Sequence, residues 1–130
     1  MSKLLKWTFL VHAIVAAVLG AALLGAPGRV LTWLGFGPLD AFANFFSRLL
    51  GAAMLALAWT SFRGWTASKW SQVAIILEGE VFYTVLGCVG LLRLGLSSHY
   101  GWLLWTTFGI LAGFALLWIV SLVRGERAHS

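Results

Sequence analysis

The chain has 130 residues, of which 61% are apolar and only 10% are charged, and its mean hydropathy is +0.93. This composition excludes a water-soluble globule, which could not cover its surface with polar groups, and it predicts an integral membrane protein. A net charge of +5 would suit nucleic acid, but the sequence lacks a basic stripe with interleaved aromatic residues, which argues against nucleic-acid binding.

Four apolar runs follow one another along the chain, at residues 7–26, 42–62, 72–92 and 102–123. Each approaches or exceeds the ~20 residues that a helix needs to cross the hydrocarbon layer. We therefore predict an all-α membrane four-helix bundle with up-down-up-down order, forming a single transmembrane domain over residues 1–130. The first run is longer than the apolar core of a signal peptide, so we expect it to be retained as a span.

Basic residues collect on one side of these spans. Those on the predicted inner side are Lys3, Lys6, Arg63, Lys69, Arg124 and Arg127, whereas the other connections hold only Arg29 with Asp40, and Arg93. By the positive-inside rule, this asymmetry predicts a multi-pass protein of the cell membrane, the inner membrane in bacteria, with both termini in the cytoplasm.

The connection between the first two spans contains an apolar piece of its own, "RVLTWLGF". Pro27 and Gly28 are typical of the end of a helix, and the piece that follows them is too short to span. We predict a short interfacial helix here, with Trp33 at headgroup depth and with Leu34 and Phe36 on its apolar side. Asp40 is then placed to cap the second span.

Two stretches of the first half carry a family resemblance. "LLGAPGRVLTWLGFG" followed by "FFSRLLGAAMLALAWTSF" resembles a widespread group of small bacterial four-span membrane proteins, and more remotely the DoxX-like four-helix membrane proteins. The second half matches only in the layout of its spans. The resemblance implies four membrane helices but no catalytic residue, because the group has no established chemistry. The glutamates at positions 78 and 80 are not part of its pattern.

Glu78 and Glu80 stand in the third span, where an ionised carboxylate is costly. Successive helical residues turn by ~100°, so the two carboxylates point to nearly opposite faces and cannot act as an adjacent acid pair. Glu80 shares its face with Tyr83, Thr84 and small residues, which predicts that it points inward. Glu78 shares its face with Phe82 and other apolar residues, which predicts a lipid-facing position.

His12 in the first span lies at a similar predicted depth to Glu80, and Arg48 in the second could reach toward it. The predicted intramembrane polar cluster, a ligand or proton site, comprises Glu80, His12, Arg48, Glu78, Tyr83 and Thr84, with Thr8 as a further hydroxyl. Three interpretations remain open. The contacts could only lock helix packing, the third helix could start late and leave both glutamates at the interface, or the cluster could bind protons or a ligand.

Other motifs offer less chemistry. Gly109 and Gly113 form a GxxxG pattern in the fourth span, which predicts close helix packing or a dimer face. Cys88 is the single cysteine, so a disulfide framework within one chain is excluded. We identify no catalytic residue, no metal-ligand spacing, no phosphate loop and no dinucleotide fingerprint, and we expect no cofactor.

Three functions fit these features. The first is a non-enzymatic accessory or lipophilic-molecule-binding bundle; the second is a small oligomeric proton-coupled transporter that uses Glu80 and His12; the third is a membrane enzyme acting on a lipid or quinone. We favour the first, because it needs only helix packing, interface anchors and one satisfied polar cluster. Transport would need a homo-oligomer, since four helices enclose little volume, and the enzyme ranks last because the sequence lacks a second catalytic group clearly in reach. The expected partners are the lipid bilayer, a lipophilic small molecule, and a second copy or another membrane subunit.

Overall fold

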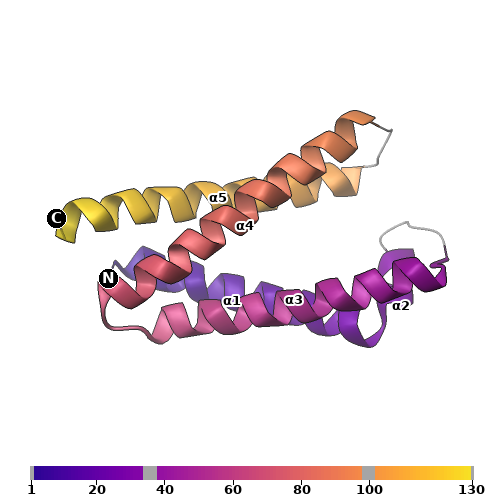
Figure 1. Ribbon diagram of the computed structural model, residues 1–130, viewed down its shortest axis with the longest axis horizontal. Helices are drawn as coiled ribbons and strands as arrows, with labels where there is room; N and C mark the ends of the chain where they lie inside the picture. Colours follow the sequence, from indigo (N-terminus) through magenta and orange to yellow (C-terminus); the bar gives the residue numbers. More distant parts are fainter. Residues whose placement is uncertain (1, 34–37, 98–101, 130) are drawn as a thin grey trace. The chain divides into compact units, whose positions relative to one another are not determined.

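The computed structural model describes residues 2–33, 38–97 and 102–129, and within these ranges the chain is all-α (Figure 1). Its helices are α1 (Lys3–Gly25), α2 (Pro27–Trp33), α3 (Ala41–Thr66), α4 (Trp70–Ser97) and α5 (Trp102–His129). The predicted fold class is confirmed, with four long helices and one short helix between the first and the second. Leu34 and Phe36 of the predicted interfacial helix lie outside the described residues.

Each of the four long helices is long and apolar enough to cross a membrane. The qualifying segments are Lys3–Gly25, Ala41–Thr66, Trp70–Arg93 and Leu104–Gly125, with hydropathies of 2.2, 1.5, 1.8 and 2.1. Because four such helices follow one another, the chain is a multi-pass membrane protein. The identity of the membrane and the cytoplasmic position of the termini stay predictions.

Helix boundaries follow local capping chemistry. The Asp40 carboxylate accepts a hydrogen bond from the Ala43 backbone N–H at 2.7 Å, which confirms Asp40 as the N-cap of α3. At the other end of the connection, α1 ends at Gly25, two residues before Pro27, and Pro27 opens α2. Proline is favoured at a first helical position because the missing N–H would have no partner there.

The chain falls into two compact units, which are described separately. The α1–α3 unit comprises residues 9–66, and the α4–α5 unit comprises residues 67–130 together with residues 1–8. The prediction of a single transmembrane domain stays a prediction.

In the α1–α3 unit, glycines let two antiparallel backbones meet. A Cβ atom at Gly51 would lie 2.7 Å from the Gly20 carbonyl oxygen and 2.6 Å from the Leu24 nitrogen. Toward the other end of the pair, the Phe9 ring lies against Gly64, where a Cβ atom would be 2.6 Å from the ring. Such close approach is how helices associate in lipid, where burial of apolar surface gives no driving force.

In the α4–α5 unit, glycines receive side chains instead of backbone. Gly87 lies against Leu111, Gly95 against Leu104 and Trp105, and Gly125 against Trp70. These pairs fix an antiparallel register for α4 and α5, which contact each other and cross at an angle in Figure 1. The same register places Trp118 of α5 at the level of Glu80 in α4.

Candidate functional site

His12 belongs to the buried stripe of α1. This stripe comprises Leu5, Phe9, His12, Ala16, Gly20 and Leu23, spaced three or four residues apart. The imidazole is 6% exposed, and its Nδ1 atom lies 2.8 Å from the Oγ atom of Ser61, which is fully buried in α3. The register that places Phe9 against Gly64 also brings His12 to Ser61. A buried polar pair therefore joins α1 to α3 within the membrane-spanning part of the chain.

Arg48 bonds elsewhere in the same unit. Its Nη1 atom donates to the Leu24 carbonyl at 2.6 Å, and its Nε atom donates to the Asn44 side chain at 3.1 Å. Leu24 is twelve residues beyond His12, which corresponds to ~18 Å of helix. The structure therefore does not bring Arg48 together with His12, and this part of the predicted cluster is corrected. Arg48 instead satisfies a carbonyl in the last turn of α1, which the helix itself leaves without a partner.

The two glutamates of α4 have different environments. Glu80 is 1% exposed, whereas Glu78 is an exposed residue. This difference agrees with the helix-face argument, which predicts that only one of the two points inward. The buried stripe that contains Glu80 also includes Val73, Leu77 and Thr84. Trp118, which lies at the same level on α5, is fully buried and stacks on Phe114 at a centroid distance of 6.2 Å.

The two threonines of the predicted cluster donate to the backbone of their own helices. Thr84 Oγ1 donates to the Glu80 backbone carbonyl at 2.7 Å, so its single proton does not go to the Glu80 carboxylate. Thr8 Oγ1 likewise donates to the Leu4 carbonyl at 3.0 Å. This pattern is common for threonine inside helices, and the membership of both residues in the polar cluster stays a prediction. Tyr83 is half-buried.

The six residues of the predicted cluster therefore belong to two units. His12 and Arg48 lie in the α1–α3 unit, where Arg48 bonds to Leu24, about 18 Å along α1 from His12. Glu78, Glu80, Tyr83 and Thr84 lie in α4. A contact of Glu80 with His12 or Arg48 would join the two units, and it stays a prediction. Within the part of the chain that the structure describes, no group of three or more His, Cys, Asp or Glu side chains could hold a metal ion.

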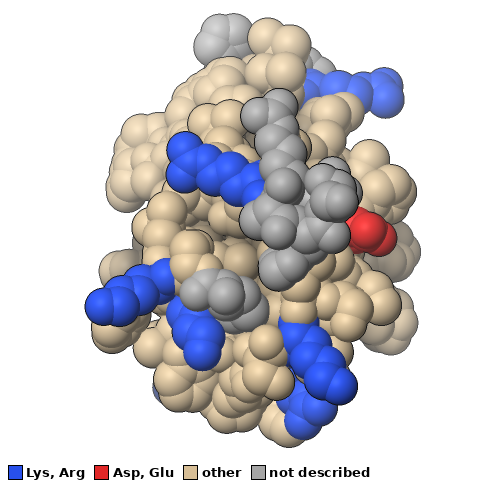
Figure 2. All heavy atoms as spheres, turned by 90° about the vertical axis from the view of Figure 1, so that its left-hand side faces the viewer, with Lys and Arg blue, Asp and Glu red and all other residues tan. Residues whose placement is uncertain are grey.

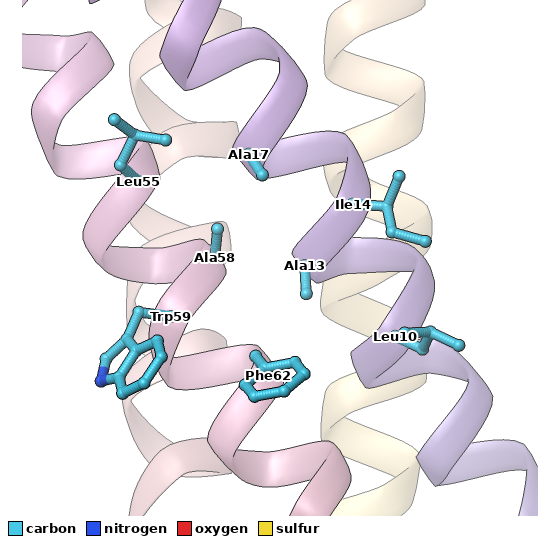
Figure 3. A pocket seen from close by; sticks show the side chains of 8 residues that line it. All are labelled: Leu10, Ala13, Ile14, Ala17, Leu55, Ala58, Trp59 and Phe62. Carbon is cyan, nitrogen blue, oxygen red and sulfur yellow. The ribbon is translucent and has the colours of Figure 1, made fainter.

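Beside the buried His12–Ser61 pair, α1 and α3 form an apolar groove with a volume of about 550 Å³. Leu10, Ala13, Ile14 and Ala17 line it from α1, and Leu55, Ala58, Trp59 and Phe62 line it from α3. Figure 3 shows the three alanines between the helices, flanked by the larger side chains. Because alanine is short, the backbones approach while a hollow remains between the flanking residues.

The groove opens at the surface of the unit. Ile14, Trp59 and Phe62 are 55%, 62% and 40% exposed, whereas Ala13 and Ala58 at its floor are both 7% exposed. The Trp59 and Phe62 rings stack on each other with centroids 6.0 Å apart, which gives the α3 side a continuous aromatic wall. Its eight lining side chains carry a single polar group, the Trp59 indole N–H.

Gly109 and Gly113 do not contact α4. A Cβ atom at either position would meet no atom within 4 Å, so the GxxxG pattern does not form the α4–α5 contact. A dimer face at these glycines stays a prediction.

Sequence reasoning did not identify Ser61 or the groove. Ser61 could have been found from its place on the face that also holds Gly51 and Ala58, at the level of His12 in an antiparallel pair. The groove had no comparable signal, because its alanines and aromatic residues are ordinary in a membrane span.

No family model, curated protein or solved structure matches the chain. The resemblance to small four-span and DoxX-like proteins therefore stays a prediction.

Proposed function

We propose that this membrane protein binds the apolar part of a lipophilic small molecule in the α1–α3 groove. The observation that carries the proposal is the groove itself, which has an alanine floor, an aromatic wall and a volume of about 550 Å³. Small-molecule sites in proteins typically have volumes of ~300–1,000 Å³ and mostly apolar linings. This function needs no catalytic group, in accord with the absence of catalytic motifs in the sequence.

Selectivity for the apolar part of the ligand must come from shape. Lipid tails are as apolar as the groove, so leaving the bilayer for the groove gains no hydrophobic free energy. A ligand is favoured only where its atoms contact the floor and wall more closely than disordered acyl chains can. The stacked Trp59 and Phe62 rings and the alanine floor offer rigid surfaces of this kind.

A photoactivatable long-chain alcohol tests the proposal with an uncharged probe. The protein is reconstituted in phosphatidylcholine nanodiscs, irradiated with the probe, and mapped by mass spectrometry. We expect labelling to be concentrated on residues of the groove. Ala17→Leu places a larger side chain in a half-buried floor position and should reduce labelling several-fold.

The matched control is Ala53→Leu, which makes the same change on an exposed position of α3 that lies on the opposite face from the groove. It should leave labelling unchanged. Uniform labelling of exposed residues on α1 and α3, or equal labelling of the wild-type protein and Ala17→Leu, would show that the groove holds only bulk lipid.

A second candidate, proton-coupled transport, is favoured by the burial of Glu80 inside a membrane-spanning helix. Ionisable residues at such positions often serve proton pathways. Glu80→Gln preserves the shape of the side chain and removes its ability to ionise, with the exposed Glu78→Gln as control. In liposomes with a pH gradient, transport predicts a proton flux that only Glu80→Gln abolishes. No flux in the wild-type protein would exclude this function.

A further inference from the structure

We infer that the ligand of the groove is an anionic lipid, whose headgroup binds Arg63 while its chain lies between α1 and α3. This inference rests on the proposed function and specifies its ligand class. It joins two features of the α1–α3 unit, the apolar groove and the cation next to it.

Arg63 is placed at one end of the groove by the geometry of α3. It follows the groove residue Phe62 directly, and it lies one helical turn beyond Trp59, so Trp59 and Arg63 share a face. Arg63 is exposed and stands in the last turn of α3, at the polar end of this apolar helix. A long arginine side chain at such a position can direct its guanidinium to headgroup depth.

The other charges of the α1–α3 unit are placed differently. Asp40 caps the far end of α3, about 35 Å of helix away from Arg63. Arg48 lies fifteen residues before Arg63 and donates to Leu24 and Asn44. Arg29 is an exposed residue of α2. Within this unit, the end of the groove near Phe62 therefore carries positive charge from Arg63 and no acidic residue.

The dimensions of the groove fit a lipid chain. Its lining residues on α1 run from Leu10 to Ala17, which corresponds to ~10 Å of helix, about a third of the hydrocarbon thickness. A chain anchored at the Arg63 end would therefore run along the groove and continue into the bilayer. Phosphate is a headgroup chemistry that suits guanidinium, because two parallel N–H donors can engage two phosphate oxygens.

Figure 2 shows basic side chains standing out on the view from the left-hand side of Figure 1. Lysines and arginines near a membrane surface each attract anionic lipid, with an effect that amounts to about a fivefold gain in affinity. For most of these cations this attraction would be non-specific. Among the cations of the α1–α3 unit, Arg63 differs because the groove residue Phe62 directly precedes it.

The experiment compares the photoactivatable long-chain alcohol with its phosphate monoester in phosphatidylcholine nanodiscs at low salt. We expect the phosphate to label the groove at about fivefold lower concentration than the alcohol. Arg63→Gln should remove this preference while the alcohol still labels the groove, which shows that the variant is folded. Arg63→Lys should keep part of the preference.

The matched control is Arg29→Gln, which removes an exposed arginine from α2 and should keep the full preference. In the wild-type protein, high salt should reduce the preference, since exposed ion pairs are screened. Equal labelling by the two probes in the wild-type protein, a preference that survives Arg63→Gln, or a preference insensitive to salt would each overturn the inference. Failure of both probes to label the groove would instead refute the proposed function.

Discussion

The α1–α3 unit and the α4–α5 unit are both built on antiparallel pairs of apolar helices, but among the described glycines only those of the first bring backbone against backbone. In the first, Gly20 and Gly51 bring backbone against backbone, whereas in the second Gly87 receives the side chain of Leu111. Backbone atoms cannot move aside, but the end of a leucine side chain can. The α1–α3 contact should therefore tolerate less change than the α4–α5 contact.

The described polar side chains also differ between the two units, because those of the α1–α3 unit include hydrogen bonds between helices. Ser61 and His12 bond between helices, and Arg48 bonds from α3 to the end of α1. In the other unit, Thr84 bonds to the backbone of its own helix. Polar contacts between α1 and α3 hold the two helices in one register, and the groove lies between these same helices. A rigid pair is a better frame for a binding site than one whose contacts can slide.

The largest effect is expected for Gly51→Ala. The new Cβ atom would meet the Gly20 carbonyl and the Leu24 nitrogen, so α1 and α3 must separate. Overpacking of this kind costs about 1–3 kcal/mol in the free energy of unfolding. The measurement is unfolding by SDS in mixed micelles, followed by circular dichroism.

The control for Gly51→Ala is Gly109→Ala, because a Cβ atom at Gly109 meets no atom within 4 Å. This change should leave stability unchanged or raise it by up to ~1 kcal/mol, since alanine is the better helix former. Equal destabilisation by both variants would contradict the proposed backbone contact at Gly51.

The His12–Ser61 hydrogen bond should give the next largest effect. A double-mutant cycle with His12→Leu and Ser61→Ala isolates their mutual interaction from the other contacts that each side chain makes. Interhelical hydrogen bonds in membranes contribute about 0.6 kcal/mol on average and up to about 1.7 kcal/mol. We expect a coupling in this range, measured by the same SDS unfolding. Additive single effects would mean that the pair does not hold α1 to α3.

Gly87→Ala tests the other half of the comparison. The new Cβ atom would meet the end of the Leu111 side chain, which can change rotamer. We expect a loss below ~1 kcal/mol, because side-chain rearrangement is cheaper than displacement of a helix. A loss as large as that of Gly51→Ala would show that the α4–α5 contact is equally rigid.

The sequence was sufficient to predict the elements of the fold but not the contacts of its polar residues. Length and hydropathy predicted four spans, and Asp40 was correctly predicted as a cap, because both depend on local chemistry. Helical periodicity separated buried Glu80 from exposed Glu78.

The partners of polar side chains depend on the register between helices and on competing local acceptors. The helical periodicity of the sequence gives information on neither. Arg48 was predicted to reach toward the centre of the membrane, but it donates to the Leu24 carbonyl at the end of α1. Ser61 was missed because its place on the buried face of α3 identifies a partner only once the antiparallel register sets it opposite His12. The groove was missed because a hollow depends on how two particular faces meet.

Thr84→Val should have the smallest effect and gives the sharpest test of how the two units use polar groups. Valine has nearly the shape of threonine, and the hydroxyl that it lacks donates to carbonyls of α4 itself. Such back-bonding adds little to helix stability and can even weaken it, so we expect a change below ~0.5 kcal/mol. Ser61→Ala removes a hydroxyl as deeply buried as that of Thr84, but one that bonds across helices, and it should cost more. If Thr84→Val were the more destabilising variant in SDS unfolding, the Thr84 side chain would have to hold α4 to another part of the protein, and the division between the two units would fail.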